Sequence, residues 1–316
     1  MLLLNSVIYV LVFVAYYFFG KTFNLTTPTY PDFNHSAVYG GGIIFSIIYL
    51  IETLISNTFG LFSVLVLLLT IISFFDDIRP IPSLYKLIIH LILGFIAAIF
   101  ILKLNFNDVF AITFLVGIII TFYTNANNFM DGVNGMMIVN NIVILATLLF
   151  VNSYIIQFTN NNPLISLLSG ALIFSVFNFR RKALLISGDA GSVVMGFIII
   201  IFVLNLYLKT NNVFVFGLII TFSVETASTI ISRLYSKKNI LDSHKEHLYE
   251  VLVFKNKVSV IKISSIYGVI QLLLSGIVLI SFYSQLENKI FYVTIFIYIL
   301  IYFFLKYKLL KYAKYD

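Results

Sequence analysis

The sequence predicts an all-α polytopic integral membrane protein that crosses the bilayer about eleven times. Hydrophobic residues make up 60% of the 316 residues and charged residues only 10%, and the mean hydropathy is +1.04. A soluble domain of this length would carry roughly 25% charged residues. Because the apolar runs continue from end to end, residues 1–316 are expected to form a single transmembrane domain.

Eleven apolar runs, separated by short polar segments, are the expected transmembrane helices. Several of them are shorter than the roughly 20 residues that span a bilayer. The runs lie near residues 2–20, 41–57, 60–75, 84–103, 108–124, 136–153, 164–179, 191–208, 213–235, 261–284 and 289–309. The first run has no basic segment before it and no small-residue cleavage pattern after it, which predicts a retained helix rather than a signal peptide.

The distribution of Lys and Arg predicts the orientation. Of the 20 basic residues, only Lys103, Lys209 and Lys289 fall in loops after even-numbered runs, which leaves 17 after odd-numbered runs or in the C-terminal tail. By the positive-inside rule, the N-terminus is expected outside and the C-terminus in the cytoplasm, in the cell (plasma or inner) membrane. The net charge of +7 is thereby assigned to cytoplasmic loops, and no nucleic-acid partner is expected.

Polar groups suited to chemistry occur at four places, all on the expected cytoplasmic face. The densest is segment 125–135, where Gly132 and Gly135 let the backbone turn closely around a bulky ligand. Taken alone, this segment is equally well explained as an Asn/Gly-rich turn between two helices. The candidate residues of the four places are Asp76 and Asp77; Asn125, Asn128 and Asp131; Asp189; and His244 and His247.

The four carboxylates predict a bound cation, because gathered at one site they would repel one another and some would protonate. The chain has no Cys, so thiolate metal sites are excluded, and oxygen ligands favour Mg²⁺ or a similar hard ion such as Mn²⁺. Lys86 and the basic stretch 180–182 suit a polyanionic substrate. Together these groups predict phosphoryl transfer; acids that are merely solvated at helix ends are the plainer alternative.

Five stretches, in order along the chain, resemble the polyprenyl-phosphate N-acetylhexosamine-1-phosphate transferases, the MraY/WecA-like family. Each stretch alone is a weak signal, but the ordered set spans nearly the whole chain. The stretches are Gly40-Gly41-Gly42; Phe75-Asp76-Asp77 followed by Lys86-Leu87; Asn125-x-x-Asn128-x-x-Asp131-Gly132-x-x-Gly135; Phe177-Asn178; and Gly188-Asp189-Ala190-Gly191-Ser192 with Gly196.

The resemblance implies that a polyprenyl phosphate in the bilayer, undecaprenyl phosphate in bacteria, attacks the β-phosphorus of a UDP-HexNAc. UMP leaves, and a polyprenyl-diphosphate sugar remains as the first membrane intermediate of a cell-surface polysaccharide. The resemblance makes Asp189 the leading metal ligand and places Asp76 and Asp77 at the metal or the lipid phosphate, one of them as a base. Asp131 is implied to be a fourth catalytic carboxylate, at the nucleotide or metal. The implied substrate-binding residues are Lys86, Asn125, Asn128, Asn134, Asn178, His244 and His247.

Two positions depart from the family's pattern. Asn134 stands where the family usually has a second Asp, in Asp-Gly-x-Asp-Gly, and an amide carries no charge. The loop 243–249 contains His244-x-x-His247-Leu248-Tyr249 in place of His-x-His-His. That form is more similar to members that begin O-antigen (lipopolysaccharide) or capsule synthesis with 6-deoxy HexNAc sugars. In such a site an apolar side chain such as Leu248 would contact the sugar position that lacks a hydroxyl group. Two solvated loop histidines are the alternative.

Four further features have expected roles. Glu225, inside run 213–235, requires a polar partner and is either structural or substrate-binding. Glu52 and His90 are expected to be satisfied by neighbours, with a place facing the cleft as the alternative for His90. The tail from Lys306 to Lys314 is expected to anchor the last helix on anionic lipid.

A multi-spanning transporter or lipid flippase is the competing class of protein, although its ionisable groups would lie near the bilayer midplane, often within inverted repeats. The resemblance also allows a homodimer.

Overall fold

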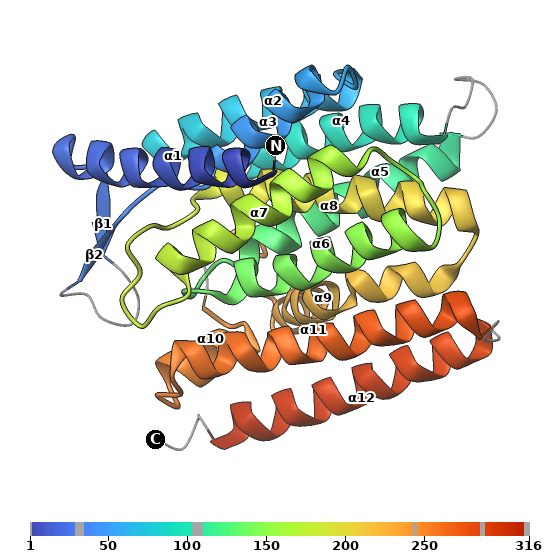
Figure 1. Cartoon of the computed structure of the whole chain (residues 1–316). Coiled ribbons are helices and arrows are strands. Elements are labelled where there is room, and N and C mark those ends of the chain that lie inside the picture. Colours follow the sequence, from blue (N-terminus) through green and yellow to red (C-terminus); the bar gives the residue numbers. More distant parts are fainter. Residues whose placement is uncertain (1, 29–34, 103–109, 243–244, 285–287, 313–316) are drawn as a thin grey trace.

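The structure, a computed structural model, describes residues 2–28, 35–102, 110–242, 245–284 and 288–312. Within these ranges the chain is mostly helical (Figure 1). Among the described residues, seven helices are long and apolar enough to cross a membrane: α3 (Leu61–Ile78), α4 (Ser83–Leu102), α5 (Phe110–Phe129), α6 (Met136–Tyr154), α8 (Asp189–Thr210), α11 (Val260–Tyr283) and α12 (Asn288–Tyr312). The chain is therefore an all-α, multi-pass membrane protein. Eleven crossings and the orientation of the chain stay predictions.

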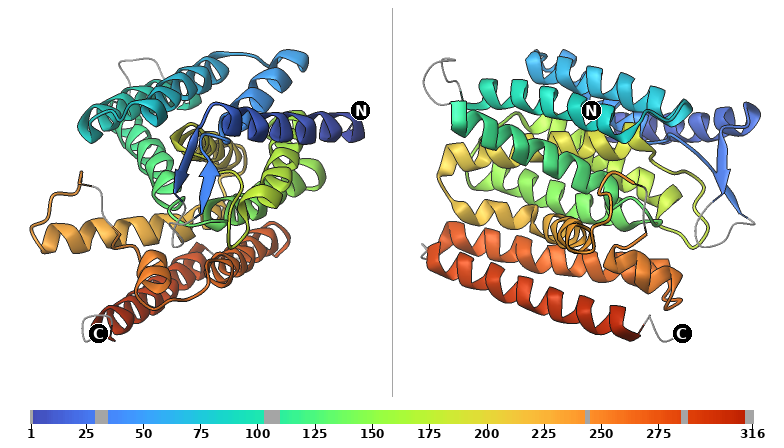
Figure 2. Two further views of the ribbon diagram at one scale, coloured as in Figure 1. Left: turned by 90° about the vertical axis from the view of Figure 1, so that its left-hand side faces the viewer. Right: turned by 180° about the vertical axis from the view of Figure 1, so that it is seen from behind.

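The other helices are shorter or less uniformly apolar. They are α1 (Leu2–Thr22), α2 (Ile43–Ile55), α7 (Asn161–Asn178), α9 (Ile220–Tyr235) and α10 (Leu248–Phe254). The run expected as one helix over 213–235 is divided into a 3-10 helix, η1 (Val213–Leu218), and α9. Asn212 starts η1 by accepting a hydrogen bond from Phe214 N at 3.0 Å, a local cap that hydropathy does not reveal. Helix α9 runs across the other helices: it is seen end-on in Figure 1 and from the side in the left-hand view of Figure 2.

Helix α8 is the centre of the bundle. It is buried along nearly its whole length and packs against α2, α3, α5 and α6. Helices in a bilayer associate largely by close packing at small residues. A Cβ atom at Gly196 of α8 would lie 2.7 Å from Asn127 Cβ on α5. A Cβ at Gly94 of α4 would lie 2.9 Å from the carbonyl oxygen of Gly117, so glycine also permits the close α4–α5 contact.

The segment between α1 and α2 holds the loop that precedes α8. Strands β1 (Thr26–Pro28) and β2 (Ser36–Val38) pair antiparallel, and Val38 also pairs in parallel with Leu185. Gly42 N donates to the carbonyl oxygen of Ser187 at 2.9 Å, and a Cβ at Gly42 would lie 2.3 Å from Gly191 Cα. The glycine triplet at 40–42 is thus a packing contact against the start of α8.

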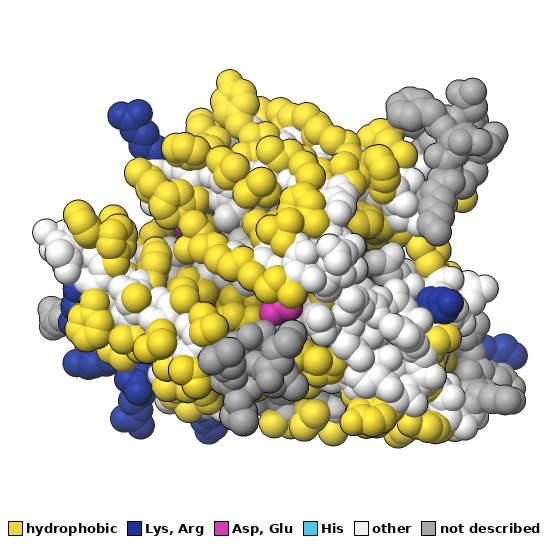
Figure 3. All heavy atoms as spheres, turned by 45° about the horizontal axis from the view of Figure 1, so that its top comes forward, with side chains coloured by type: hydrophobic (Ala, Val, Ile, Leu, Met, Phe, Trp, Pro, Cys, Tyr) yellow, Lys and Arg dark blue, Asp and Glu magenta, His cyan; other side chains and the backbone are white. Residues whose placement is uncertain are grey.

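The polar connections gather at one end of the bundle. The strands, the loop after α7 and α10 all lie at the left of Figure 1. The face shown in Figure 3 is mostly hydrophobic, and its Lys and Arg side chains lie at the margins.

The position of Lys306 corrects one expectation. This residue of the predicted lipid anchor is only 5% exposed and lies against α9.

Candidate functional site

Asp77, near the end of α3, holds the first turn of α8. Its Oδ1 accepts hydrogen bonds from Asp189 N at 2.8 Å and from the Tyr39 hydroxyl at 3.1 Å, and its Oδ2 accepts from Ala190 N at 3.2 Å. A carboxylate at a helix N-terminus satisfies amides that have no partner within the helix and favourably meets the helix dipole. Gly188 has a φ of +70°, and a Cβ there would lie 2.5 Å from Asp77 Oδ2. This cap places Asp189 beside the end of α3.

Lys86 of α4 lies between two carboxylates. Its Nζ is 2.7 Å from Asp76 Oδ2 and 3.3 Å from Asp189 Oδ2. The other oxygen of Asp76 accepts Ile81 N at 2.6 Å, which fixes that carboxylate relative to the α3–α4 turn. The side chains of Lys86 and Asp189 are 28% and 21% exposed, so this pair of acids shares a cation at a position that solvent reaches.

Asp131 lies behind this group, in the turn between α5 and α6. The buried Ser187 hydroxyl donates a short hydrogen bond to Asp131 Oδ2. Burial raises the pKa of the Asp131 carboxyl to about 7, while the Ser187 hydrogen bond lowers it and the carboxylates of Asp189 and Asp77 raise it further. Asp131 is therefore a carboxyl that can gain or lose a proton near neutral pH.

The asparagines of segment 125–135 divide into two groups. Asn125 and Asn128 face the cavity described below: Asn125 Oδ1 is 3.1 Å from His90 Nδ1, and Asn128 Oδ1 accepts the Ser192 hydroxyl at 3.0 Å. Asn134 instead donates to the carbonyl oxygens of Arg180 and Arg181 at 3.1 and 3.3 Å. Its amide holds the basic turn after α7.

Asn178 has a similar structural contact set. Its Oδ1 accepts Gly135 N at 2.8 Å, and its Nδ2 donates to the Leu185 carbonyl oxygen at 2.9 Å. Gly135 has a φ of +83°, which favours glycine at this turn. The side-chain amides of Asn134 and Asn178 thus join the α5–α6 turn to the loop before α8, and direct contact of either with substrate stays a prediction.

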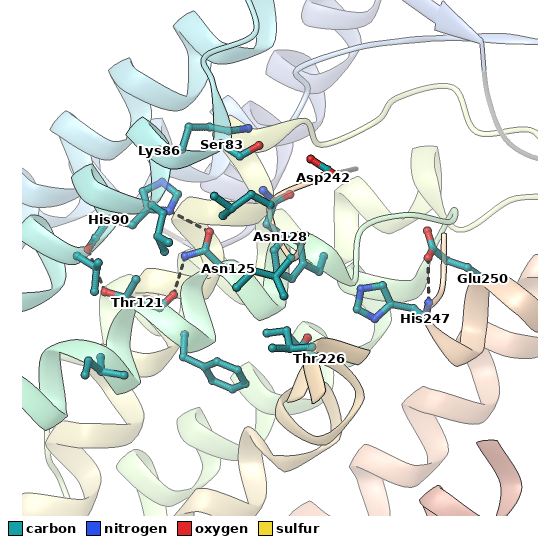
Figure 4. A pocket seen from close by; sticks show the side chains of 18 residues that line it. Ser83, Lys86, His90, Thr121, Asn125, Asn128, Thr226, Asp242, His247 and Glu250 are labelled. Carbon is teal, nitrogen blue, oxygen red and sulfur yellow. Dashed lines mark hydrogen bonds between the residues drawn. The ribbon is translucent and has the colours of Figure 1, made fainter. Parts of the chain in front are cut away.

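A cavity of about 550 Å³ runs from Lys86 to His247 between α4, α5, α9 and the start of α10. Figure 4 labels the polar residues that line it, and the other lining residues are apolar. The hydroxyl of Thr226 lines the cavity, is buried, and has no hydrogen-bond partner among the residues that the structure describes. The apolar lining residues are Leu87, Leu91, Ile118, Phe122, Phe129, Ile230, Ile240 and Leu241.

His247 lies at the other end of this cavity and begins α10. Its backbone N–H donates to Glu250 Oε2 at 3.2 Å, and its Nδ1 is 3.6 Å from Glu225 Oε1. Glu225 also accepts Leu248 N at 2.7 Å and the Tyr267 hydroxyl, so the expectation that this buried acid has partners is confirmed. Burial raises the pKa of Glu250 to about 7, against the opposing effect of His247.

The structure brings most of the predicted residues together. Asp76 and Asp189 meet at Lys86, and Asp77 accepts a hydrogen bond from Asp189 N. Lys86, Asn125, Asn128 and His247 line one cavity. His244 lies outside the described residues. Leu248 packs with Val224 and Tyr302 rather than lining the cavity, which corrects the expectation that it would face a donor sugar.

Sequence reasoning missed several residues of this region. Tyr39 was adjacent to a recognised glycine motif, but nothing in the sequence linked its hydroxyl to Asp77. Glu250 was detectable, since an acid three residues after a helix start is typical of a capping box. Ser187 and Thr226 carried no signal. In the part of the chain that the structure describes, no three His, Asp or Glu side chains are grouped closely enough to hold a metal ion by themselves.

One family model matches the central part of the chain. The family model described as Glycosyl transferase family 4 matches residues 59–207, which include α3 to α8 with Asp76, Asp77, Lys86 and Asp189. No curated protein matches the chain. The matched family is of the MraY/WecA type. The loop with His247 lies beyond the matched residues, so the subgroup stays a prediction.

Proposed function

We propose that this protein transfers a HexNAc 1-phosphate from a UDP-linked donor to a polyprenyl phosphate, undecaprenyl phosphate in a bacterium, and releases UMP. The observation that carries the proposal is Lys86, held between Asp76 and Asp189 at one end of an apolar-walled cavity. The family match covers all three residues. The reaction would take place at the cytoplasmic face of the cell membrane and supply the first lipid intermediate of a cell-surface polysaccharide.

In this reaction an oxygen of the lipid phosphate forms a bond to the β-phosphorus of the donor. The bond from that phosphorus to the UMP oxygen breaks, and UMP departs with the electron pair. Two anionic phosphates must meet, so the site has to supply positive charge. The ammonium group of Lys86 is placed to do so. A phosphate monoester with a second pKa near 6 is already mostly ionised at pH 7, so a protein base contributes little.

The same carboxylates fit a divalent cation. Asp76 and Asp189 direct oxygens at one point, which Lys86 Nζ occupies. Mg²⁺ commonly takes one or two carboxylates and completes its shell with water and substrate phosphate oxygens. Asp189 and Asp76 are the residues that would hold Mg²⁺, or Mn²⁺ in its place, and the ion would neutralise phosphate charge. Asp77 fits a ligand role less well, because both of its oxygens accept hydrogen bonds from the protein.

The cavity suits the two substrates at different positions. Its apolar walls between α4, α5 and α9 match a polyprenyl chain, whose phosphate would then reach Lys86. Asn125, Asn128 and His247 offer hydrogen bonds to the nucleotide or sugar of the donor. The donor is a HexNAc or a 6-deoxy HexNAc. Ile240 and Leu241 are apolar side chains that line the same cavity as His247 and are available to contact a 6-deoxy position.

The proposal is tested by UMP release from the purified protein in detergent or nanodiscs. UDP-GlcNAc, UDP-QuiNAc and UDP-FucNAc are offered with undecaprenyl phosphate and Mg²⁺, and each component is omitted in turn. We expect UMP only when donor, lipid phosphate and Mg²⁺ are all present. Absence of UMP with every donor would contradict the proposal. Preference among donors by roughly 10–100-fold in kcat/KM would identify the sugar, since a single hydroxyl in an apolar pocket discriminates modestly.

A further inference from the structure

His90 lines the same cavity as Lys86, one helical turn further along α4. The sequence leaves two roles open for this residue, a satisfied buried side chain or a group that faces the cleft, and the structure combines them. His90 is 5% exposed, and its Nδ1 is 3.1 Å from Asn125 Oδ1 on α5 (Figure 4). Its Nε2 has no hydrogen-bond partner among the described residues. A buried ring nitrogen that the protein leaves unpaired at a cavity wall is available to a ligand.

The hydrogen bonds of Asn125 fix the position of the ring proton. Asn125 Nδ2 donates to the Thr121 carbonyl oxygen at 2.8 Å, and a backbone carbonyl oxygen can only accept. The amide oxygen of Asn125 is therefore the atom that faces His90, and it too can only accept. His90 Nδ1 must carry a proton to make this contact. In the neutral ring, Nε2 then carries the lone pair and can only accept a hydrogen bond.

The position of His90 along α4 indicates which ligand Nε2 meets. Four residues advance a helix by about 6 Å, so His90 lies that much deeper along α4 than Lys86. The lining beyond His90 is apolar and includes Leu91 of α4 and Ile118 of α5. His90 therefore lies between the ammonium group of Lys86 and the apolar walls. This is where the phosphate of a bound lipid would join its hydrocarbon chain.

A lone pair on Nε2 discriminates between phosphates by their protons. A phosphate monoester, such as the head group of a polyprenyl phosphate, has a second pKa near 6 and takes up a proton readily near neutral pH. Each phosphate of a UDP-sugar is a diester, whose single acidic proton is lost at this pH. Only the monoester can direct a P–O–H proton at Nε2, whereas the ionised diphosphate would meet the nitrogen lone pair with another lone pair.

We propose that His90 recognises the phosphate of the lipid acceptor: Asn125 holds the ring proton on Nδ1, and Nε2 accepts a hydrogen bond from a phosphate monoester whose anionic oxygens meet Lys86. The acceptor's role in turnover rests on the proposed function. The proton on Nδ1 and the binding of a prenyl phosphate do not, because neither requires the reaction. The other titratable side chains on the cavity wall belong to the loop after α9 and to the start of α10, and they are Asp242, His247 and Glu250.

The proton position and the phosphate contact can be measured by ¹⁵N NMR of histidine-labelled protein in nanodiscs, since the chain has only four His residues. His90→Gln assigns the signals. At neutral pH we expect His90 to carry its proton on Nδ1 and none on Nε2. Farnesyl phosphate should shift the Nε2 signal toward that of a hydrogen-bonded nitrogen, and farnesol and UDP-GlcNAc should leave it in place.

Three NMR results would overturn the proposal. They are a proton on Nε2 in the free protein, an Nε2 signal that farnesyl phosphate does not move, and an equal shift with farnesol or UDP-GlcNAc. All three are read from the wild type, so they do not depend on whether a variant folds.

Two variants separate the roles of the two ring nitrogens. The amide of Asn at this position can replace Nδ1 as the donor to Asn125 but leaves nothing at Nε2, whereas the amide of Gln reaches the place of Nε2. We expect His90→Asn to raise the Kd for farnesyl phosphate about tenfold, the effect of one hydrogen bond, and His90→Gln to retain most of the affinity. Affinity for farnesol should not change. An unchanged Kd in folded His90→Asn, or equal losses in both variants, would overturn the proposal.

Turnover distinguishes the lipid phosphate from the phosphates of the donor. His90→Asn should raise KM for undecaprenyl phosphate about tenfold and leave KM for the UDP-sugar unchanged. A higher KM for the donor alone would assign His90 to the donor site and overturn the proposal. If the wild type is inactive with every donor, the proposed function fails, but the NMR signals and the Kd for farnesyl phosphate still decide the role of His90.

Discussion

The two ends of the cavity treat charge in opposite ways. At the Lys86 end, the carboxylates of Asp76 and Asp189 share one ammonium group, and the side chains of Lys86 and Asp189 are 28% and 21% exposed. At the His247 end, Glu225 is fully buried, and both of its oxygens accept hydrogen bonds from the protein. The first arrangement can exchange its internal cation for an incoming charged ligand, whereas the second holds its groups in one fixed arrangement.

The difference assigns separate tasks to the two ends. An ammonium group that two carboxylates share and that solvent reaches suits phosphates that arrive and leave. An imidazole held in place by several protein groups suits recognition of a neutral group. Changes at the Lys86 end should therefore act on the chemical step, and changes at the His247 end should act on donor recognition or on stability.

The largest expected effect is that of Asp189→Asn. Removing this charge eliminates half of the carboxylate pair while the side chain keeps its shape. We expect turnover to fall at least about 100-fold, as for loss of a group that stabilises transition-state charge. The measurement is UMP release at saturating Mg²⁺, with size-exclusion profile and Tm as controls for folding. Wild-type turnover in Asp189→Asn would break the assignment of chemistry to this end.

Lys86→Met should have the next largest effect. It leaves Asp76 and Asp189 facing each other without the cation between them, and truncating one partner of a close charge pair costs a few kcal/mol. We expect kcat to fall about 10–100-fold and the Mg²⁺ concentration for half-maximal activity to change. Lys86→Arg is the matched control, since it keeps the charge. Equal kinetics in wild type and Lys86→Met would show that the ammonium group is not needed for phosphate transfer.

Asp77→Asn tests whether this residue serves the fold more than the metal. An amide still caps α8, but the charge that meets the helix N-terminus is lost, which should cost about 1–2 kcal/mol. Tyr39→Phe removes one of its hydrogen bonds and should cost about 1 kcal/mol. Thermal unfolding measures both. For Asp77→Asn we expect kcat to fall with little change in donor KM. If weaker donor binding were the whole effect of Asp77→Asn, Asp77 would belong to the donor site instead.

The smallest effect concerns the pH dependence of stability at the His247 end. The folded pKa of Glu250 is about 7, raised by burial, and its unfolded value is roughly 4.3. Between these values the folded state holds a proton that the unfolded state has lost, so stability decreases as pH rises from about 4.3 to about 7 and is then constant. Glu250→Gln keeps the capping group and should remove the part of this decrease that Glu250 contributes.

Tm measured at pH 5 and pH 8 checks this expectation. Asp131, whose pKa burial also raises to about 7, should leave a residual slope in Glu250→Gln. Parallel Tm profiles of wild type and Glu250→Gln would show that Glu250 titrates alike in the folded and unfolded protein.

Sequence patterns predicted which candidate residues lie close together better than they predicted how the helices pack. Ordered motifs grouped Asp76, Asp77 and Asp189, and these residues do meet. The cap that Asp77 forms on α8 was not predictable, because it joins residues 112 positions apart in the chain. Hydropathy predicted membrane helices but not the division of run 213–235, since an apolar 3-10 turn has the same composition as a helix.

Lys306 shows the same limit. A lysine near the end of an aromatic-rich helix is usually placed at the membrane interface, because its long side chain reaches out to water. Only the packing of α12 against α9 reveals that this side chain points inward to Thr229.

The bond that breaks in the donor tests the central claim most directly. Donor labelled with ³²P at the β-phosphorus is incubated with undecaprenyl phosphate, Mg²⁺ and the purified protein, and the nucleotide and lipid fractions are separated. We predict unlabelled UMP, with all transferred label in the lipid fraction and none of either product from Asp189→Asn. Labelled UDP in the nucleotide fraction, with an unlabelled sugar on the lipid, would mean glycosyl rather than phosphoryl transfer and would contradict the role given to Lys86, Asp76 and Asp189.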